Sequence, residues 1–203
     1  MAFTLKGKKL SGEEVEALFS ELRALLVSQS AARFEEAVNR GYVYHVCNQS
    51  TVVTQAGLSA TTPALTIANR VGSGKIVKIW YAGCVGLVAA VAGAAVYACL
   101  GGGAGAAAVT ETTAATVRNA KTGDTTAPPG VACLAVATLP AAPVAIALLG
   151  AQLTGAITTI PVVAPFGRWF DGALNIRANY NFTIQTSTAT TLFCDYIFEV
   201  QDE

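Results

Sequence analysis

Charged residues are scarce in this chain. They make up 13% of its 203 residues, about half the share of a typical soluble domain. Thirteen basic and thirteen acidic side chains cancel, so the basic excess that nucleic-acid binding needs is missing. Hydrophobic residues make up 53%, which excludes a disordered chain. Two classes remain: a soluble protein whose surface is largely covered by partners, or a membrane protein.

Residue types that perform catalysis are also few. His45 is the single histidine, and residues 42–194 hold only three acids, Glu111, Asp124 and Asp171. A catalytic triad places a histidine beside both a carboxylate and a nucleophile, but His45 has no acid near it in the sequence. No run of carboxylates has the spacing of a calcium-binding loop. The sequence therefore predicts a protein that is not an enzyme, with no catalytic residues, no cofactor and no metal site.

The five cysteines are widely spaced and form no CxxC pair. This spacing in apolar sequence is typical of reduced, buried cysteines rather than of disulfides or a zinc site. Residues 1–14 lack the apolar segment of a signal peptide, so we expect synthesis in a reducing cytoplasm. The cysteines are Cys47, Cys84, Cys99, Cys133 and Cys194.

Two glycine-rich segments resemble nucleotide-binding loops but lack required residues. Gly72–Lys75 ends like a P-loop, yet Asn69 and Ile76 stand where a glycine and a hydroxyl residue are needed. Gly101–Ala106 fits a dinucleotide-binding pattern, but the segment before Asp124 is polar, whereas that fold needs a buried strand there. Both segments are interpreted as turns or loops.

Residues 1–41 differ from the rest because they hold 12 of the 26 charges. They predict an amphipathic helix or helix pair: Ser11 and Glu14 have the spacing of a capping box, and Gly41 is placed to end the helix. An apolar stripe at helical spacing packs either on the body of the same chain or on another subunit. The candidate partner contacts on this stripe are Leu18, Phe19, Leu22 and Leu26.

From residue 42 onward the pattern is that of β-strands. Alternating apolar and polar residues predict a strand over 42–47 and a hairpin through Gly72–Gly74. They also predict a terminal hairpin over 176–200 with one buried and one solvent-exposed face. We expect about eight to ten strands. The predicted organisation is an N-terminal helical arm (1–41) and a mainly β body (42–203), a jelly-roll-like antiparallel sandwich.

A two-span membrane protein is the alternative suggested by two uncharged runs. Residues 79–110 and 125–167 contain no charge and exceed the roughly 20 residues that cross a bilayer. Eighteen of the 31 residues from 79 to 109 are alanine or glycine, and the second run is interrupted by Pro140, Pro143, Pro161 and Pro165. Both features disfavour insertion as helices, so we do not expect a membrane as a partner.

The organisation as a whole resembles structural proteins of tailed-phage virions, particularly capsid cement (decoration) proteins and head-fibre proteins. The segments that carry the resemblance are Gly72–Val77, which enters a long strand, and Tyr180–Ala189 near the end. The resemblance implies a homotrimer on the capsid surface that stabilises the shell by binding the major capsid protein or another virion protein. It carries no catalytic residue to this chain.

Aromatic residues leave a further function open. Phe166–Asp171 is the densest aromatic and charged cluster of the body. It is typical of a loop whose aromatic residues are anchored in the core or in a subunit interface. If Trp80, Tyr97 or Trp169 instead lies exposed in a groove, the pattern favours a trimeric fibre tip that binds a receptor or a glycan.

Overall fold

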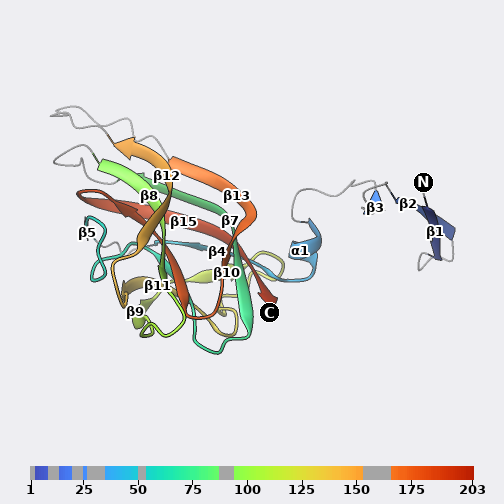
Figure 1. Ribbon diagram of the computed structural model, residues 1–203, viewed down its shortest axis with the longest axis horizontal. Helices are drawn as coiled ribbons and strands as arrows, with labels where there is room; N and C mark the ends of the chain where they lie inside the picture. Colours follow the sequence, from blue (N-terminus) through green and yellow to red (C-terminus); the bar gives the residue numbers. More distant parts are fainter. Residues whose placement is uncertain are drawn as a thin grey trace. The chain divides into compact units, whose positions relative to one another are not determined.

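In a computed structural model the chain divides into two compact units, Met1–Glu36 and Ala37–Glu203 (Figure 1). The structure describes residues 3–8, 14–19, 25–26, 35–49, 54–86, 94–152 and 166–203. The division lies close to the boundary at residue 41 that the change in composition predicts. The expectation of a mainly β protein is confirmed, because both units are built from antiparallel sheets.

The first unit contains a small sheet of β1 (Phe3–Lys8), β2 (Glu14–Phe19) and β3 (Leu25–Leu26). The predicted helix is therefore not confirmed over these residues. The register explains the difference, because it places Lys6 opposite Glu16 and Lys8 opposite Glu14. Opposite charges in facing positions favour an antiparallel pair, and Glu14–Ala17 also alternates between charged and apolar residues, a pattern with the period of a strand.

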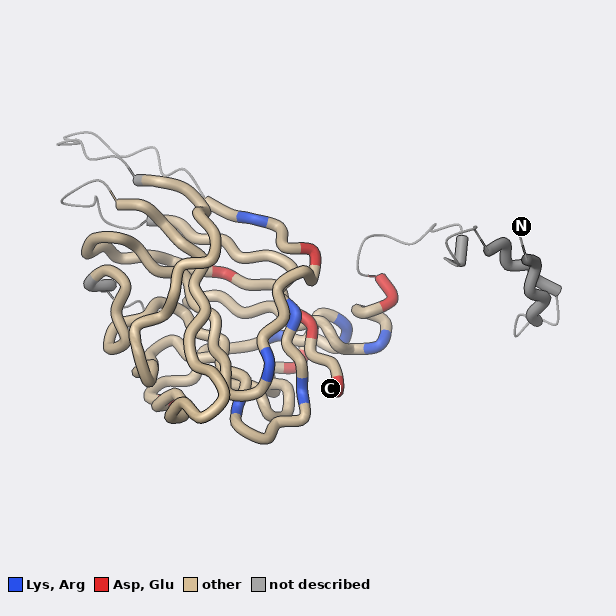
Figure 2. The backbone as a smooth tube through the Cα atoms, viewed as in Figure 1, with Lys and Arg blue, Asp and Glu red and all other residues tan. Residues whose placement is uncertain are grey.

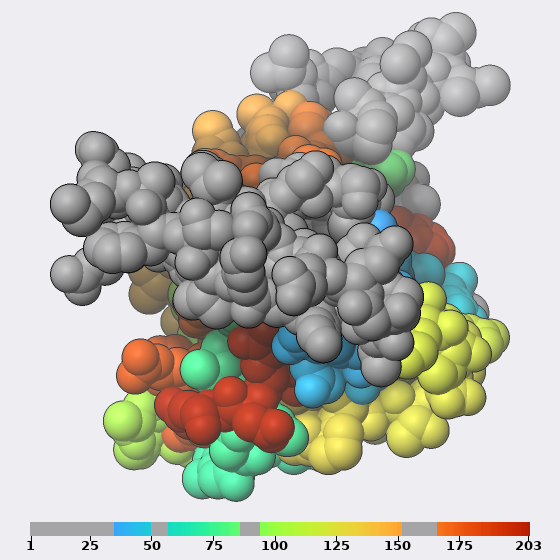
Figure 3. Space-filling view, turned by 90° about the vertical axis from the view of Figure 1, so that its right-hand side faces the viewer, coloured from blue at the N-terminus to red at the C-terminus, as the bar shows by residue number. Residues whose placement is uncertain are grey.

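Helix α1 (Glu35–Asn39) ends where the sequence predicts. Gly41 has a φ of +78°, and its N–H donates to the Val38 carbonyl at 2.8 Å. The Tyr42 N–H donates to the Ala37 carbonyl at 3.1 Å. These two bonds form a Schellman motif. Lys121 and Asn119 hold the end of the helix to the loop of residues 120–130, which lies against this segment in Figure 3.

Two six-stranded antiparallel sheets form the second unit, called the body here. Sheet 1 has the order β10-β4-β15-β7-β13, and β5 also pairs with β15. Sheet 2 has the order β12-β8-β14-β6-β11-β9. The strands of sheet 1 are β4 (Val43–Cys47), β5 (Thr54–Ala56), β7 (Lys75–Gly86), β10 (Val117–Asn119), β13 (Phe166–Ile176) and β15 (Ala189–Asp202). Those of sheet 2 are β6 (Thr66–Asn69), β8 (Ala94–Gly102), β9 (Thr110–Ala114), β11 (Val131–Thr138), β12 (Val144–Gln152) and β14 (Tyr180–Thr186).

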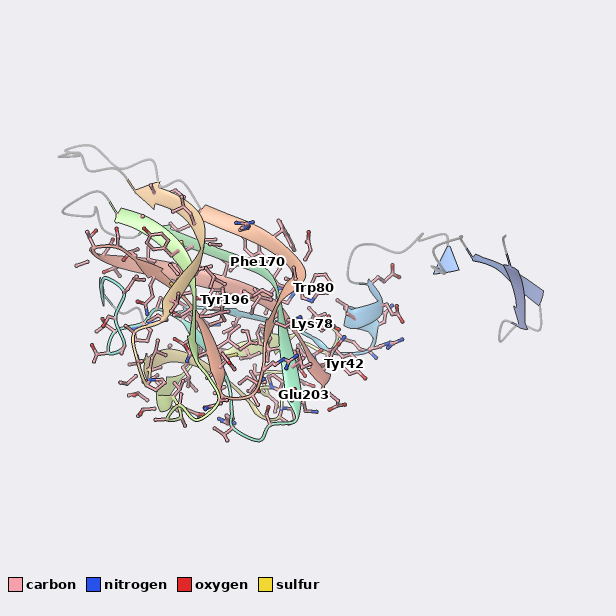
Figure 4. The ribbon with its side chains drawn as sticks, viewed as in Figure 1. Tyr42, Lys78, Trp80, Phe170, Tyr196 and Glu203 are labelled. Atoms are coloured by element: carbon pink, nitrogen blue, oxygen red, sulfur yellow. The ribbon has the colours of Figure 1, made fainter. Side chains whose placement is uncertain are left out.

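One apolar core lies between the two sheets. Ile79 and Phe198 reach it from sheet 1, while Ile67 and Phe182 reach it from sheet 2. Tyr196 joins the sheets by hydrogen bonds: its hydroxyl donates to the Leu65 carbonyl at 2.7 Å and accepts from the Ile184 N–H at 3.0 Å (Figure 4). Figure 2 shows how much of the surrounding backbone carries no charged residue. The apolar excess of the sequence is thus partly explained by this shared core.

Both predicted hairpins are wrong. Gly72–Gly74 connects β6 to β7, and these strands belong to different sheets. The terminal strands β14 and β15 likewise belong to sheets 2 and 1. A short turn and alternating residues predict two strands, but they do not decide whether the second strand pairs with the first or crosses to the opposite sheet.

The face of β14 that the sequence predicts to be exposed to solvent is in fact buried. Thr183 and Gln185 have 0% exposure because the segment of residues 57–65 covers them. The Gln185 side chain donates to the Ser59 carbonyl at 2.8 Å and accepts from the Ser59 N–H at 2.6 Å. Thr183 and Gln185 therefore form hydrogen bonds with a covering loop instead of with water.

No helix among the described residues has the length and apolar character to cross a membrane. Most of the described residues of the two uncharged runs lie in strands. Residues 79–86 belong to β7, and residues 94–102 form β8. Residues 131–138 and 144–152 form β11 and β12.

Candidate binding face

The predicted partner contacts fall in the small sheet of the first unit. Leu18 and Phe19 belong to β2 and Leu26 to β3, whereas Leu22 lies outside the described residues. The register places Leu18 opposite Leu26. These residues therefore follow the period of a strand in the structure, and the helical stripe predicted from their spacing is absent at the described positions.

The outer face of sheet 1 brings together residues far apart in the sequence. Arg118 lies opposite His45, and His45 lies opposite Ile197. Ile197 also lies opposite Tyr81, which lies opposite Trp169. These five residues, called the cross-strand row, share the outer face because their neighbours Val117, Val46, Tyr196 and Ala82 point into the core. At roughly 4.8 Å between strands, the row extends about 19 Å across the sheet.

Two aromatic residues form one end of the cross-strand row. The rings of Tyr81 and Trp169 lie 5.0 Å apart at 51°, and Trp169 is 45% exposed. A Cβ on Gly83 or Gly167 would come within 2.4 or 2.3 Å of the Tyr81 hydroxyl. The phenol ring therefore lies flat over these two glycines instead of projecting away from the sheet. A ring in this position presents its π face outward.

A β-bulge in β13 separates the exposed aromatic residue from the core. Trp169 pairs with Tyr81 and Leu174 with Ile79, so residues 170–173 lie opposite the single residue Trp80. Asp171 and Gly172 have φ values of +55° and +73°. Bulges of this kind re-aim side chains and are frequent beside functional sites. The aromatic and charged residues of this segment are typical of a loop, but the segment is a strand that carries Trp169 on its outer side.

The other two aromatic residues considered in the sequence have different surroundings. Trp80 is half-buried, and its indole N–H donates to Glu199 at 3.2 Å. Tyr97 is half-buried on sheet 2, opposite Leu148 of β12. Of the three candidates, Trp169 is thus the one with a large exposed area.

Polar groups gather at the other end of the cross-strand row. A pocket of about 270 Å³ opens there between β4, β10 and β15. Asp195 lies in the neighbouring row, opposite both Cys47 and Gly83. Its carboxylate lies 2.7 Å from the position of a Cβ on Gly83, on the same side as the Tyr81 hydroxyl. The polar side chains that line the pocket are His45, Cys47, Gln49, Thr116, Arg118 and Asp195.

Asp195 interacts electrostatically with a residue at each end of the face, His45 and Tyr81. Burial raises the pKa of Asp195, and nearby His45 opposes this rise. Burial lowers the pKa of His45 from its ordinary 6.5, with Asp195 opposing, so the imidazole is neutral at pH 7. Burial and then Asp195 raise the pKa of Tyr81. The sequence does not indicate this neighbourhood, because Asp195 is far from His45 along the chain and the two come close only through the pairing of β4 with β15.

The cysteines are free, but one prediction about them is wrong. Cys84, Cys99, Cys133 and Cys194 are buried, whereas Cys47 is exposed. Cys84 and Cys194 lie opposite one another in the core. Within the described parts of the chain, no group of three or more histidine, cysteine or acidic residues is placed to hold a metal ion.

An apolar row lies on β12, at the edge of sheet 2. Val144, Ile146 and Leu148 alternate along the strand and are 69%, 42% and 59% exposed. Ala147, which lies between Ile146 and Leu148, and Leu149, which follows Leu148, pack against the core. The strand therefore buries one apolar face while the other, called the β12 row, meets solvent in a single copy of the chain.

Comparisons of the chain with protein-family models, with curated proteins and with solved structures find no match in any of the three. Function is therefore inferred from the fold and from two surfaces of the body. One surface is the face of sheet 1 with the cross-strand row and the pocket. The other is the β12 row.

Proposed function

We propose that this chain is a structural protein of a tailed-phage virion, a cement or decoration protein on the capsid surface. In this proposal the body forms a homotrimer and the first unit binds the major capsid protein or another virion protein. The proposed role is non-catalytic and requires no cofactor. Protein is made in the host cytoplasm and becomes part of the virion.

The strand order of the body supports a jelly roll, the fold proposed here. A jelly roll has eight strands in two four-stranded sheets, formed by two Greek keys. Eight strands of the body can be numbered one to eight in chain order: β4, β6, β7, β8, β12, β13, β14 and β15. In this numbering sheet 1 has the order first–eighth–third–sixth. Sheet 2 then has the second–seventh–fourth–fifth order. Strands β9, β10 and β11 come between the fourth and the fifth and widen both sheets.

The β12 row is the observation that carries the assembly role. Edge strands with exposed apolar residues invite pairing with other chains, and monomeric proteins usually place charges on them. No charge occurs anywhere between Asp124 and Arg168. Complete burial of such a side chain contributes about 1.5–3 kcal/mol, so covering the row with a neighbouring copy stabilises an oligomer. Three copies around an axis close without leaving the surface open.

The division into two units supports a separate attachment role for the first unit. The apolar core between the two sheets is formed by residues from Val46 to Val200, so the body holds a core of its own. Nearly half of the charges lie in residues 1–41. Charged residues suit a contact that must select one partner and one orientation.

Light scattering after size exclusion tests the trimer. Wild-type protein is expected to have three times the chain mass without detergent, and Leu148→Glu is expected to run as a monomer because it places a charge in the interface. Val71→Glu is the matched control, since Val71 is 64% exposed on the turn after β6, away from β12. A wild-type monomer, or a Leu148→Glu protein that stays trimeric, contradicts the proposal.

Cosedimentation with capsid shells tests attachment. Shells of the virus that encodes the chain, prepared without this protein, are mixed with wild-type protein or with a chain lacking residues 1–34. We expect the shortened chain to keep its trimer and its thermal transition but to stay in the supernatant. Pelleting equal to that of wild type shows that attachment does not use the first unit and contradicts that part of the proposal.

A further inference from the structure

We propose that the outer face of sheet 1 binds a neutral oligosaccharide, with one sugar ring stacked on Tyr81 and Trp169 and its hydroxyl groups bonded at the pocket beside Asp195. This binding activity is separate from the assembly role, which uses the β12 row and the first unit. The proposal rests on the aromatic end of the face, on its polar end, and on the distance between them.

The aromatic end has the geometry that a sugar ring requires. The C–H groups on one side of a pyranose are weakly positive, and the face of an aromatic ring is negative. Tyr81 lies flat over Gly83 and Gly167, so its face is turned outward. Trp169 lies 5.0 Å away and is tilted by 51°. Together the two rings form a shallow corner in which a ring-shaped ligand contacts both.

The two glycines are required for this orientation of the Tyr81 ring. Any side chain at Gly83 or Gly167 would occupy the place of the Tyr81 hydroxyl. The ring would then stand up from the sheet and present an edge instead of a face. Tyrosine and tryptophan also lose little conformational entropy when a ligand orders them, because each has two side-chain torsions.

The polar end supplies the groups that hydroxyls need. The Asp195 carboxylate and the Tyr81 hydroxyl lie over the same glycine, so a sugar stacked on Tyr81 places hydroxyls within reach of Asp195. A carboxylate accepts hydrogen bonds from hydroxyl groups, while a guanidinium donates to them. Arg118, Gln49 and neutral His45 line the adjoining pocket.

The charge of the face favours a neutral ligand. Arg118 and Asp195 lie in the same pocket and balance one another, so the face lacks the basic excess that attracts a nucleic acid or another polyanion. The cross-strand row extends about 19 Å, which is long enough for more than one sugar unit. An oligosaccharide therefore matches both the charge and the length of the face.

The experiment begins with an array of neutral hexose and N-acetylhexosamine oligosaccharides, probed with the full-length protein. Bound saccharides are then titrated while tryptophan fluorescence is recorded. We expect Trp169→Ala to weaken binding by about tenfold or more because the stacking surface is lost. Asp195→Asn is expected to weaken it as well without altering the aromatic corner. Tyr180→Ala is the matched control, because Tyr180 is 37% exposed but lies on β14 of sheet 2.

Each outcome decides the proposal. Binding that weakens in both Trp169→Ala and Asp195→Asn, but not in Tyr180→Ala, supports it. No binding to any saccharide of the array overturns it, as does binding that Trp169→Ala leaves unchanged. If no saccharide binds and Trp169→Ala lowers the oligomer mass in light scattering, the face is a subunit interface. Circular dichroism of each variant confirms that a loss of binding is not a loss of fold.

Discussion

At the scale of single residues, the cysteines have two kinds of surroundings. Cys47 is exposed on the outer face of sheet 1. Burial raises the pKa of Cys84, Cys99 and Cys133 to about 12 and raises that of Cys194 as well. Because the thiolate is the reactive form of cysteine, the buried residues react poorly even where a reagent reaches them.

Alkylation of the folded protein should therefore modify a single cysteine. With iodoacetamide at pH 8, a thiol with a pKa near 12 is ionised in only about one molecule in ten thousand. We expect intact-mass spectrometry to find one adduct, located at Cys47 by peptide mapping, and none in Cys47→Ala. In denaturant all five should react. Two or more rapid adducts in folded protein would show that the core is more open than the structure.

The exposure of Cys47 illustrates a limit of sequence patterns. Alternation in Val43–Cys47 identifies two faces, and Tyr44 and Val46 on one of them pack in or against the core. The other face holds Val43, His45 and Cys47, of which Val43 is buried and the other two are exposed. Because both faces contain apolar residues, the alternation predicts a strand but does not show whether Cys47 lies on the buried or on the exposed face.

At the scale of elements, two glycines near the end of β8 show two separate reasons why a position requires glycine: too little space for a side chain, and a left-handed backbone conformation. Gly102 and Gly105 have similar φ values, +83° and +81°. A Cβ on Gly102 would lie 2.3 Å from the Asn179 carbonyl oxygen, whereas nothing lies within 4 Å of one on Gly105. The end of β8 thus needs Gly102 for space and for conformation, and the turn that follows it needs Gly105 for conformation alone.

Alanine substitution should separate these two causes. Gly105→Ala is expected to lower the free energy of unfolding by about 1–2 kcal/mol, the cost of a left-handed conformation for a residue with a Cβ. Gly102→Ala should lose about 1–3 kcal/mol more because backbone atoms must move. Urea unfolding followed by circular dichroism measures both. Equal losses in the two variants would show that the contact with Asn179 does not constrain the turn.

The positions of the strands are easier to predict from the sequence than the pairing between them. The strand patterns at residues 42–47 and 192–200 agree with β4 and β15, because alternation is a local property of the chain. Pairing is not local: β15 lies between β4 and β7. In the first unit, the apolar residues of Val15–Phe19 fit the spacing of a helix as well as that of a strand. The pairing of β2 with Lys6 and Lys8 of β1 favours the strand.

At the scale of the whole molecule, Tyr196 forms one hydrogen-bonded connection between the two sheets, and Asn69 of β6, which donates to the Lys75 and Ile176 carbonyls, forms another. The Tyr196 side chain is 1% exposed, and its hydroxyl bonds to Leu65 and Ile184, both on the side of sheet 2. Burial raises the pKa of this hydroxyl, which stays protonated and able to donate. The two layers are therefore held in one relative position by a directional contact as well as by apolar packing.

Removing this hydroxyl should weaken the whole body. Tyr196→Phe keeps the ring but leaves the buried Leu65 carbonyl without this donor, so we expect a loss of about 1–3 kcal/mol in the free energy of unfolding. Tyr42→Phe is the control, because Tyr42 is 42% exposed and should change stability by less than about 0.5 kcal/mol. Thermal and urea unfolding measure both variants. A neutral Tyr196→Phe would indicate that the layers do not depend on this bond.

The candidate face was visible in the sequence only in part. Trp169 stands out in the sequence because aromatic and charged residues are dense around it, but nothing in the sequence indicates that it lies in line with Tyr81, Ile197, His45 and Arg118. These residues come from five strands and become neighbours through the register alone. Likewise, the glycines under Tyr81 have meaning only once β7 and β13 are paired.

The position of β15 has a consequence for how the protein is made. It follows all the other strands in the chain, yet it lies inside sheet 1 and joins β4 to β7. While the ribosome is still synthesising residues 189–202, β4 and β7 have no common partner and the core lacks Tyr196 and Phe198. The body therefore cannot complete its core before residues 189–202 have left the ribosome, and until then β4 and β7 lack the strand that lies between them.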